Sequence, residues 1–279
     1  MKTTVYTSDK KTHFFKELKD IFRDIIASHF LAYQMAKRDI QAQYRQSFLG
    51  FFWAFAPIIV NSVVWLFLNG SGVVSIKGID VPYPVFVIVG TMLWSIFVDV
   101  VQSPLTAVNS GKGIMSKINF PKEALLMAGL YKIIFNLGLK LIFLAVVLIY
   151  FGVSVDYHIL YLPLYLLMLM IFSFALGIII TPIGLIYTDI AKIINIGVPF
   201  IMYLTPVVYA APTHGIFKIL FEINPLTNFI NDARNTLIGK PITSFEICGI
   251  ITVVSIFVLL FGLVVFRKSM PIIIEKNAA

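Results

Sequence analysis

Six long apolar runs, separated by short polar stretches, dominate the hydropathy pattern of the chain. A helix needs about 20 mostly apolar residues to cross the hydrocarbon core of a bilayer. Each run is long enough, so the pattern predicts an all-α integral membrane protein with six transmembrane helices. Prolines in the fourth and fifth runs permit kinks or breaks there. The runs lie at about residues 51–69, 84–104, 125–151, 159–187, 193–211 and 247–266.

Residues 14–32, ahead of the first run, have one apolar face and one charged face. This pattern predicts an N-terminal amphipathic helix that lies in the membrane interface. The alternative is a helix packed on a soluble domain. The first 13 residues are polar and no apolar core with a cleavage site follows them, so we expect the first span to insert uncleaved. The apolar positions include Phe14, Leu18, Ile21, Phe22, Ile25 and Ile26, and charged residues such as Lys16, Asp20 and Arg23 lie opposite.

The segment between the fifth and sixth runs, residues 212–246, is too polar to span and too apolar for an ordinary loop. Two short amphipathic helices, divided at Asn224 and Pro225, fit its sequence. We expect a re-entrant or interfacial helical hairpin that dips into the outer leaflet or caps a cavity. A plain interfacial loop is the alternative.

Composition and charge support a membrane protein and indicate its orientation. The chain is 59% apolar and 13% charged, whereas soluble domains are about 45–50% apolar and 25% charged. Sixteen Lys and Arg residues fall on one side of the six predicted spans and four on the other, with Lys132 and Lys140 inside the third span. The positive-inside rule then places both termini in the cytoplasm. Because the basic residues sort by membrane side, we do not attribute the net charge of +8 to nucleic-acid binding.

The chain lacks the motifs of the common membrane-embedded enzymes. It has no G-x-x-x-x-G-K-[ST] phosphate loop, since the similar stretch 109–117 departs from that pattern, and no H-E-x-x-H or D-x-D. The four histidines are scattered, and the single cysteine, Cys248, excludes an internal disulfide and a cysteine-based zinc site. We expect no catalytic residue, metal or cofactor. A membrane-embedded transferase, a secondary carrier and a membrane scaffold are weaker alternatives.

Two polar stripes lie within the predicted spans. Intramembrane charges cost about 2.5–3.5 kcal/mol each and are often functional. The stripes either line a polar path for substrate, with lysines that meet a phosphate, or Lys132 reaches the headgroups and Asp99 pairs with a lysine. One stripe comprises Thr91, Ser95, Asp99 and Gln102, and the other comprises Lys132, Asn136 and Lys140.

Aromatic residues crowd the first, second and fifth predicted spans. Sugar rings stack on aromatic faces, but interfacial belts and packing also use aromatics. A small and polar face on the first span, which includes Asn61, permits close helix approach. The candidate channel and substrate residues are Phe51, Phe55, Asn61, Trp65, Trp94, Asp99, Lys132, Lys140 and Tyr203.

A charged, glutamine-rich segment, residues 37–47, stands directly before the first span. It either anchors the span at the headgroups or is a contact surface for a partner that moves the span. An anchor needs only positive charge, whereas amide and guanidinium groups suit a polar contact. We therefore favour a docking surface.

Three segments resemble the motifs of ABC-2 type permeases that export polysaccharides. The stretch "RDIQAQYRQSFLGFFWAFAPI" (38–58) resembles the signature before and within their first span. "INFPKEALL" (118–126) is similar to the motif after their second span, and "INPLTNFINDARNTLIG" (223–239) to the N-P-[LM]-T motif and the helix after it. Their spacing covers nearly the whole chain and points to the exporters of O-antigen, capsule and teichoic acid.

The resemblance implies a cytoplasmic N-terminal region (1–50), a six-span transmembrane domain (51–266) and a cytoplasmic tail (267–279). Two copies would form a channel in the inner, cytoplasmic membrane. Each would contact a separate ATPase subunit that holds ATP and Mg, so this chain would not itself be an enzyme. The substrate would be an O-antigen-like polysaccharide, commonly on an undecaprenyl-diphosphate carrier. Teichoic acid, capsule or another lipid-linked or amphiphilic substrate is the alternative.

The resemblance also assigns residues to the partner surface and the channel exit. The contacts to the ATPase would come from the polar segment before the first span and from the loop after the second. The outer helices would form a gate. The ATPase-contacting residues are Arg38, Asp39, Gln41, Tyr44, Arg45, Gln46, Phe120, Pro121, Lys122 and Glu123, and the gate residues are Asn224, Pro225 and Asn228.

Overall fold

The structure, a computed structural model, describes residues 13–45, 47–73, 81–115, 117–210 and 214–278. These residues form α-helices and short 3-10 helices joined by turns, and they include no β-strand. The prediction of an all-α protein is therefore confirmed. The helices are α1 (Phe14–Arg45), η1 (Gly50–Ala54), α2 (Ala56–Gly70), α3 (Tyr83–Met115), α4 (Glu123–Tyr150), η2 (Tyr157–Tyr161), α5 (Leu162–Ile186), α6 (Thr188–Phe200), η3 (Ile201–Leu204), α7 (Gly215–Ile223), α8 (Pro225–Leu237) and α9 (Phe245–Ala278).

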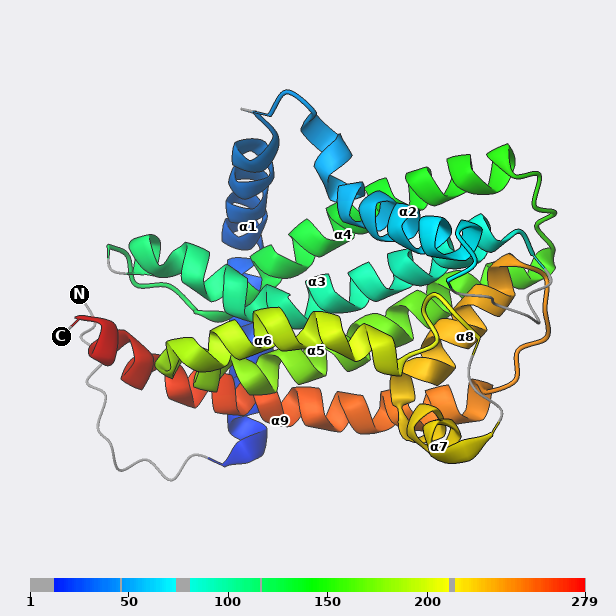
Figure 1. Ribbon diagram of the computed structural model, residues 1–279. Helices are drawn as coiled ribbons and strands as arrows, with labels where there is room; N and C mark the ends of the chain where they lie inside the picture. The colour runs from blue at the N-terminus through cyan, green and yellow to red at the C-terminus, as the bar shows by residue number, and fades with distance from the viewer. Residues whose placement is uncertain (1–12, 46, 74–80, 116, 211–213, 279) are drawn as a thin grey trace.

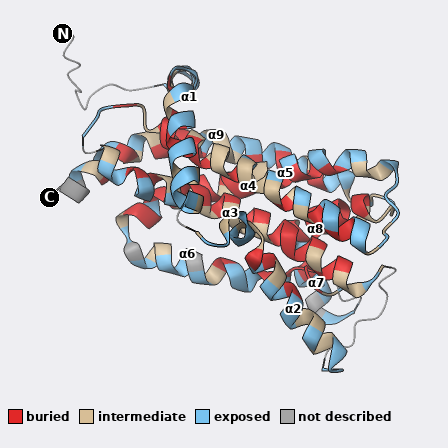
Figure 2. Ribbon diagram, turned by 90° about the horizontal axis from the view of Figure 1, so that it is seen from above, coloured by how far each residue is buried: buried red, intermediate tan, exposed pale blue. Residues whose placement is uncertain are grey.

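The long helices α3, α4, α5 and α9 run along one direction, and α1 crosses them near the end at which α9 finishes (Figure 1). Helices α7 and α8 lie at the opposite end of the bundle. Helix α3 is central, since it packs against α2, α4, α5, α6 and α8. The buried residues accordingly concentrate on α3, α5 and α8 (Figure 2).

Four helices are long and apolar enough to cross a membrane: α3, α4, the joined η2–α5 segment and α9. They coincide with the second, third, fourth and sixth predicted spans, although α3 and α9 extend well beyond the apolar runs. The outer faces of α4, α5 and α9 carry exposed apolar side chains such as Ile142, Leu167 and Phe257, which is the surface expected where lipid rather than water is the solvent. Over its described range, helix α3 has no exposed large apolar side chain.

The first and fifth predicted spans are interrupted rather than continuous. The first consists of η1 and the 15-residue α2, which starts with a proline in its first turn. In the fifth, α6 contains Pro199 and gives way to η3 after Phe200. Thr205 is then extended, with φ −136° and ψ 141°, because a residue before proline avoids the helical region. Hydropathy detected these runs, but the prolines decide where their helices begin and end.

Glycine at position 177 lets α5 approach α3 closely. A Cβ added there would overlap the carbonyl oxygen of Val101 and lie 3.2 Å from Cδ of Pro104. We expect Gly177→Ala to lower the free energy of unfolding by about 1–3 kcal/mol, which is typical of overpacking. Gly138→Ala on α4 is the control, because its Cβ would meet no atom within 4 Å. Thermal unfolding of the two purified variants measures the difference, and equal melting temperatures would contradict this packing.

Candidate functional site

Helix α1 joins the predicted interface helix and the predicted docking segment in one continuous helix of 32 residues. One face packs on the bundle through Ile21, Ala32 and Met35. A second face carries exposed apolar side chains, among them Phe22 and Ile26. Basic residues such as Lys16 and Arg23 are exposed, whereas Glu17 and Asp24 lie toward the bundle. Helix α1 therefore combines bundle contacts with an exposed surface that is both apolar and basic, as expected at a membrane interface.

A single arginine near the end of α9 ties α1, α4 and α9 together. The guanidinium of Arg267 lies 2.8 Å from Asp24 and 3.5 Å from Glu17 on α1, and 3.1 Å from Glu123 on α4. Glu123 is only 3% exposed, so its charge depends on this partner. The planar guanidinium can serve several carboxylates at once because it has five donors. We call these four residues the Arg267 tie.

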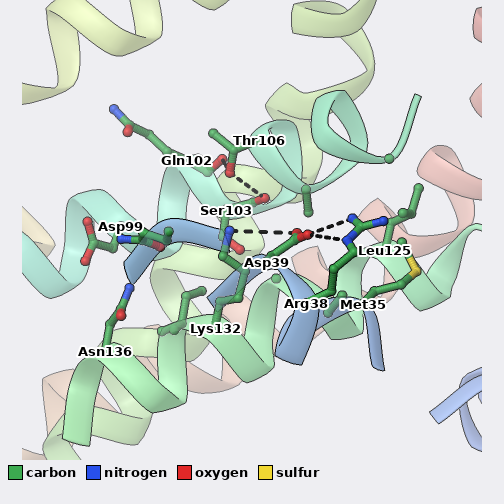
Figure 3. Close-up of a pocket in the computed structure, with 16 residues that line it drawn as sticks. Met35, Arg38, Asp39, Asp99, Gln102, Ser103, Thr106, Leu125, Lys132 and Asn136 are labelled. Atoms are coloured by element: carbon green, nitrogen blue, oxygen red, sulfur yellow. Dashed lines mark hydrogen bonds and ion pairs between the residues drawn. The ribbon is translucent and has the colours of Figure 1, made fainter. Parts of the chain in front are cut away.

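A polar cleft of about 220 Å³ opens between α1, α3 and α4 (Figure 3). It lies where α1 crosses the spans, and Gly111 and Gly129 allow α3 and α4 to approach there. Met35, Leu125 and Ile133 form apolar parts of its wall. Its polar lining residues are Arg38, Asp39 and Gln43 from α1, Asp99, Gln102, Ser103 and Thr106 from α3, and Lys132 and Asn136 from α4.

The charged groups of the cleft are arranged as pairs of opposite sign. Arg38 donates to Oδ1 of Asp39 at 2.6 Å, and Nζ of Lys132 lies 4.0 Å from the other oxygen of Asp39. Deeper in the bundle, Lys140 is 2% exposed and donates to Asp99 at 2.6 Å and to Ser95 at 2.7 Å. The sequence-based alternative in which Asp99 pairs with a lysine is therefore confirmed. Lys132 points toward Asp39 rather than only toward the headgroups.

The neutral polar groups of the cleft are less completely paired. Tyr44 donates its hydroxyl proton to Oδ1 of Asn136 at 3.1 Å. Burial and, secondarily, the charge of Asp99 raise the pKa of Tyr44, so the hydroxyl stays a proton donor. The amides of Gln43 and Gln102 make no hydrogen bond within the described residues, and neither does Nδ2 of Asn136.

The predicted ATPase-contacting residues separate into exposed and inward-facing groups. Arg38, Gln41 and Arg45 are exposed along the charged side of α1. Tyr44 instead packs on Phe51, with ring centroids 4.8 Å apart. Gln46 lies outside the described residues.

The loop residues after α3 are mostly covered. Phe120 is 9% exposed and Glu123 3%, whereas Pro121 and Lys122 are half-buried. The ammonium of Lys122 lies 4.6 Å from the centre of the Phe120 ring. Burial lowers the pKa of Lys122, partly offset by the charge of Glu123. Lys117, Ile118 and Asn119, earlier in this loop, are exposed.

The predicted channel residues do not form one surface. Asp99 and Lys132 line the cleft, and Lys140 lies behind its wall, paired with Asp99. Phe55 stacks on Phe143 of α4 with centroids 4.9 Å apart. Phe51 and Asn61 are exposed on η1 and α2. Trp94 is 5% exposed and packs against Phe97, so within this chain it belongs to the core. Thr91, from the same stripe, is buried against Ser62 of α2.

Aromatic residues also gather at the outer end. Trp65 lies 6.5 Å from Tyr203 and 6.3 Å from Tyr209 between ring centroids, and Tyr209 lies 6.0 Å from Phe221 of α7. The hydroxyl of Tyr209 donates to the carbonyl of Tyr203. This arrangement places two predicted channel residues, Trp65 and Tyr203, beside the outer helices rather than beside the cleft.

The outer helices meet at Asn224, as the sequence predicted. Its side chain accepts from the Leu226 N–H at 3.0 Å and donates to the Leu204 carbonyl at 2.8 Å. Asn224 therefore caps α8 and holds it to the end of η3. Pro225 occupies the first turn of α8, where its missing N–H costs nothing, and Asn228 is half-buried on the same helix.

Helix α8 carries two buried charged residues whose burial the sequence did not predict. Arg234 is 3% exposed, donates to the carbonyls of Pro206 and Val207 at 3.0 and 2.6 Å, and stacks on Phe86 at 3.7 Å. It thereby satisfies carbonyl groups of the irregular segment after η3, which have no helical partner.

The second buried charge, Asp232, is fully buried. Its carboxylate accepts hydrogen bonds from Tyr165, from the backbone and side chain of Thr243, and from the backbone of Ser244. In the sequence, Asp232 and Arg234 are simply charged residues beside the apolar face of an amphipathic segment. Solvent-exposed residues show the same pattern, so the sequence does not indicate that these two are buried.

Four membrane-capable helices, with α3 at their centre and the amphipathic α1 crossing them, describe a multi-pass membrane protein. The chain belongs to the ABC-2 type transporter family, whose sequence profile matches residues 31–238. This match covers about three quarters of the chain, including the C-terminal part of α1, the cleft and the outer helices.

A similar curated protein has a named transport role. Over 105 residues the chain is 29% identical to the O-antigen export system permease protein RfbA of Myxococcus xanthus. The aligned stretch covers 38% of this chain and 39% of that protein. The chain therefore aligns with about two fifths of the length of this relative.

Proposed function

We propose that this chain is the permease subunit of an ATP-driven exporter that moves a lipid-linked polysaccharide across the cytoplasmic membrane. The family match over residues 31–238 carries the proposal. The similarity to an O-antigen export permease favours an O-antigen-like glycan as the cargo, and the proposed carrier is undecaprenyl diphosphate. Teichoic acid, capsule or another amphiphilic lipid is the alternative cargo.

In this proposal the chain crosses the membrane six times, with both termini in the cytoplasm. The segment from η1 to α2, residues 50–70, and the segment from α6 through η3 supply the two crossings that are not single long helices. The charge distribution and the position of α1 and the end of α9 at one end of the bundle support this orientation. Helices α7 and α8 then cap the outer end and gate the exit.

The proposed energy source is a separate ATPase subunit that binds ATP and Mg, with two copies of each subunit in the complex. Residues 1–50 form the cytoplasmic region, 51–266 the transmembrane domain and 267–279 the tail. The exposed polar side of α1 near Gln41 and Arg45 is the proposed contact with the ATPase, together with the loop after α3. The side chains of Gln41 and Arg45 are exposed and make no hydrogen bond or ion pair with the residues that the structure describes, which suits a polar interface.

Replacing Arg45 with Ala is expected to weaken binding of the co-expressed ATPase about tenfold or more, because a contact arginine is a common hot spot. Arg45→Lys should restore the binding only partly, since it keeps the charge and loses the planar fork. The control is Lys19→Ala, which removes a positive charge from the exposed surface near the start of α1. Co-purification and titration of the ATPase on the membrane-embedded permease measure the effect.

Two results would count against the proposal. If no P-loop ATPase from the same organism binds the wild-type chain, the energy source is wrong. If Arg45→Ala and Lys19→Ala bind the ATPase equally well, the segment is an anchor and the contact lies elsewhere.

A further inference from the structure

The proposed function does not specify which part of the substrate binds in the cleft between α1, α3 and α4. A lipid-linked glycan offers two kinds of head group to such a site, an anionic diphosphate and uncharged sugar rings. The cleft is lined by α1 together with α3 and α4, and in the proposed orientation it lies toward the cytoplasmic end of the spans. We propose that the cleft binds an uncharged sugar unit next to the carrier and not the diphosphate. This inference rests on the proposed function.

The charges disfavour a phosphate in the cleft. Both cationic groups that line it already face a carboxylate: Arg38 lies 2.6 Å from Asp39, and Lys132 lies 4.0 Å from it. Behind the wall, Lys140 is held by Asp99. A diphosphate would sit close to two carboxylates and would have to compete with them for each cation, and like charges at such distances repel.

The free polar groups suit hydroxyl groups. The amides of Gln43 and Gln102 and the Nδ2 of Asn136 have no hydrogen-bond partner within the described residues. Oδ1 of Asp99 is likewise unused, and 43% of that side chain is exposed. Amides supply donors and acceptors, and a carboxylate supplies acceptors. Neighbouring hydroxyls on a sugar ring both donate and accept, so these groups are complementary to them.

The cleft is also the size of one small group. Its volume of about 220 Å³ lies below the 300–1,000 Å³ that is usual for pockets that hold a drug-sized molecule. Tyr44 fixes the orientation of Asn136 through its hydroxyl, and Lys140 fixes Asp99. The two groups therefore reach the cleft already oriented, which lowers the entropic cost of binding.

The test compares two probes on the permease–ATPase complex in nanodiscs. One probe is undecaprenyl-diphosphate bearing a single N-acetylhexosamine, and the other is the same carrier diphosphate without the sugar. Gln102→Leu and Asp99→Asn should each weaken binding of the sugar-bearing probe about tenfold, as expected for one lost hydrogen bond to an oriented group. Neither should change binding of the sugarless probe. Gln34→Leu, an exposed glutamine of α1 outside the cleft, is the matched control.

Three outcomes of this binding experiment would contradict the proposed sugar site. If both probes lose affinity equally, the cleft binds the diphosphate and the proposal is wrong. If the wild type binds the sugar-bearing probe and both variants bind it as well, the sugar binds elsewhere and only this inference fails. If the wild type binds neither probe, the proposed cargo fails and the sugar site fails with it. Size-exclusion profiles that match the wild type establish that the variants are folded.

Discussion

Asp232→Ala should lower the stability of the protein more than any other single change at its outer end. The carboxylate is fully buried and accepts four hydrogen bonds, two of them from backbone N–H groups at Thr243 and Ser244, directly before α9. Alanine would leave the buried Tyr165 hydroxyl without its acceptor and would remove three further hydrogen bonds from the exposed Thr243 and the half-buried Ser244. An unsatisfied buried donor costs about 1–3 kcal/mol and a hydrogen bond to a charged group contributes about 1.5–3 kcal/mol, so we expect a loss of about 3 kcal/mol or more.

That loss corresponds to a fall of about 6–12 °C in melting temperature for a chain of this size. Tyr165→Phe removes only one of the four donors and should cost about 1 kcal/mol. Asn231→Ala is the neighbouring control, because its half-buried side chain has no hydrogen bond within the described residues. Thermal unfolding in one detergent measures all three variants. Equal melting temperatures for the Asp232 and Asn231 variants would show that the carboxylate does not hold α8 to α9.

Arg267→Ala should have a comparable effect at the other end of the bundle. It leaves Glu17, Asp24 and Glu123 close together without their shared cation. Removing one partner of a largely buried ion pair costs about 3–5 kcal/mol, and repulsion among the remaining carboxylates adds to that. Because the tie joins α1 to α4 and α9, we expect α1 to detach before the bundle unfolds.

Hydrogen exchange of α1 amides, followed by mass spectrometry, distinguishes detachment from global unfolding. The backbone amides of residues 14–32 should exchange faster in Arg267→Ala while those of α3 and α5 stay protected. Lys268→Ala removes the same charge from the exposed neighbouring position and should leave the exchange unchanged. The double variant Arg267→Met with Glu123→Gln should recover part of the protection, because it removes the buried charge along with its partner. Unchanged protection of α1 in Arg267→Ala would contradict the role of the tie.

The spans that could be predicted are those whose helices are set by hydropathy alone. Helices α3, α4, α5 and α9 coincide with uninterrupted apolar runs. The runs at α2 and α6 are also apolar, but α2 begins only at Ala56, with Pro57 in its first turn, and α6 ends one residue after Pro199. Hydropathy averages over a window and does not register a missing N–H or a fixed φ.

The sequence predicted which polar residues of the cleft share a helix face, but not which of them form ion pairs between helices. Helical spacing placed Asp99 and Gln102 on one stripe, and Lys132, Asn136 and Lys140 on another. Which lysine meets Asp99 depends on how α3 and α4 are aligned, and that alignment depends on contacts such as Gly129 against Ser103. The inward turn of Tyr44 depends in the same way on α4.

Asp232 and Arg234 were missed for a different reason. Each satisfies backbone groups of a segment far from α8 in the sequence: residues 243–244 for Asp232 and residues 206–207 for Arg234. A local pattern does not reveal a partner of this kind. Buried charges in a membrane protein are costly unless they are paired. Asp232 and Arg234 meet this requirement by bonding to backbone groups of irregular segments, which have no hydrogen-bond partners within a helix.

The central claim is that this chain moves a lipid-linked glycan only when a separate ATPase drives it. The direct measurement uses proteoliposomes that contain the purified chain, its co-purified ATPase and a fluorescent lipid-linked glycan in the leaflet facing the ATPase. Appearance of the glycan in the opposite leaflet is followed with an impermeant quencher. We expect movement that requires both subunits and hydrolysable ATP. Hydrolysis of ATP by the complex while the glycan stays in its leaflet, or movement of the glycan by the chain without the ATPase, would contradict this function.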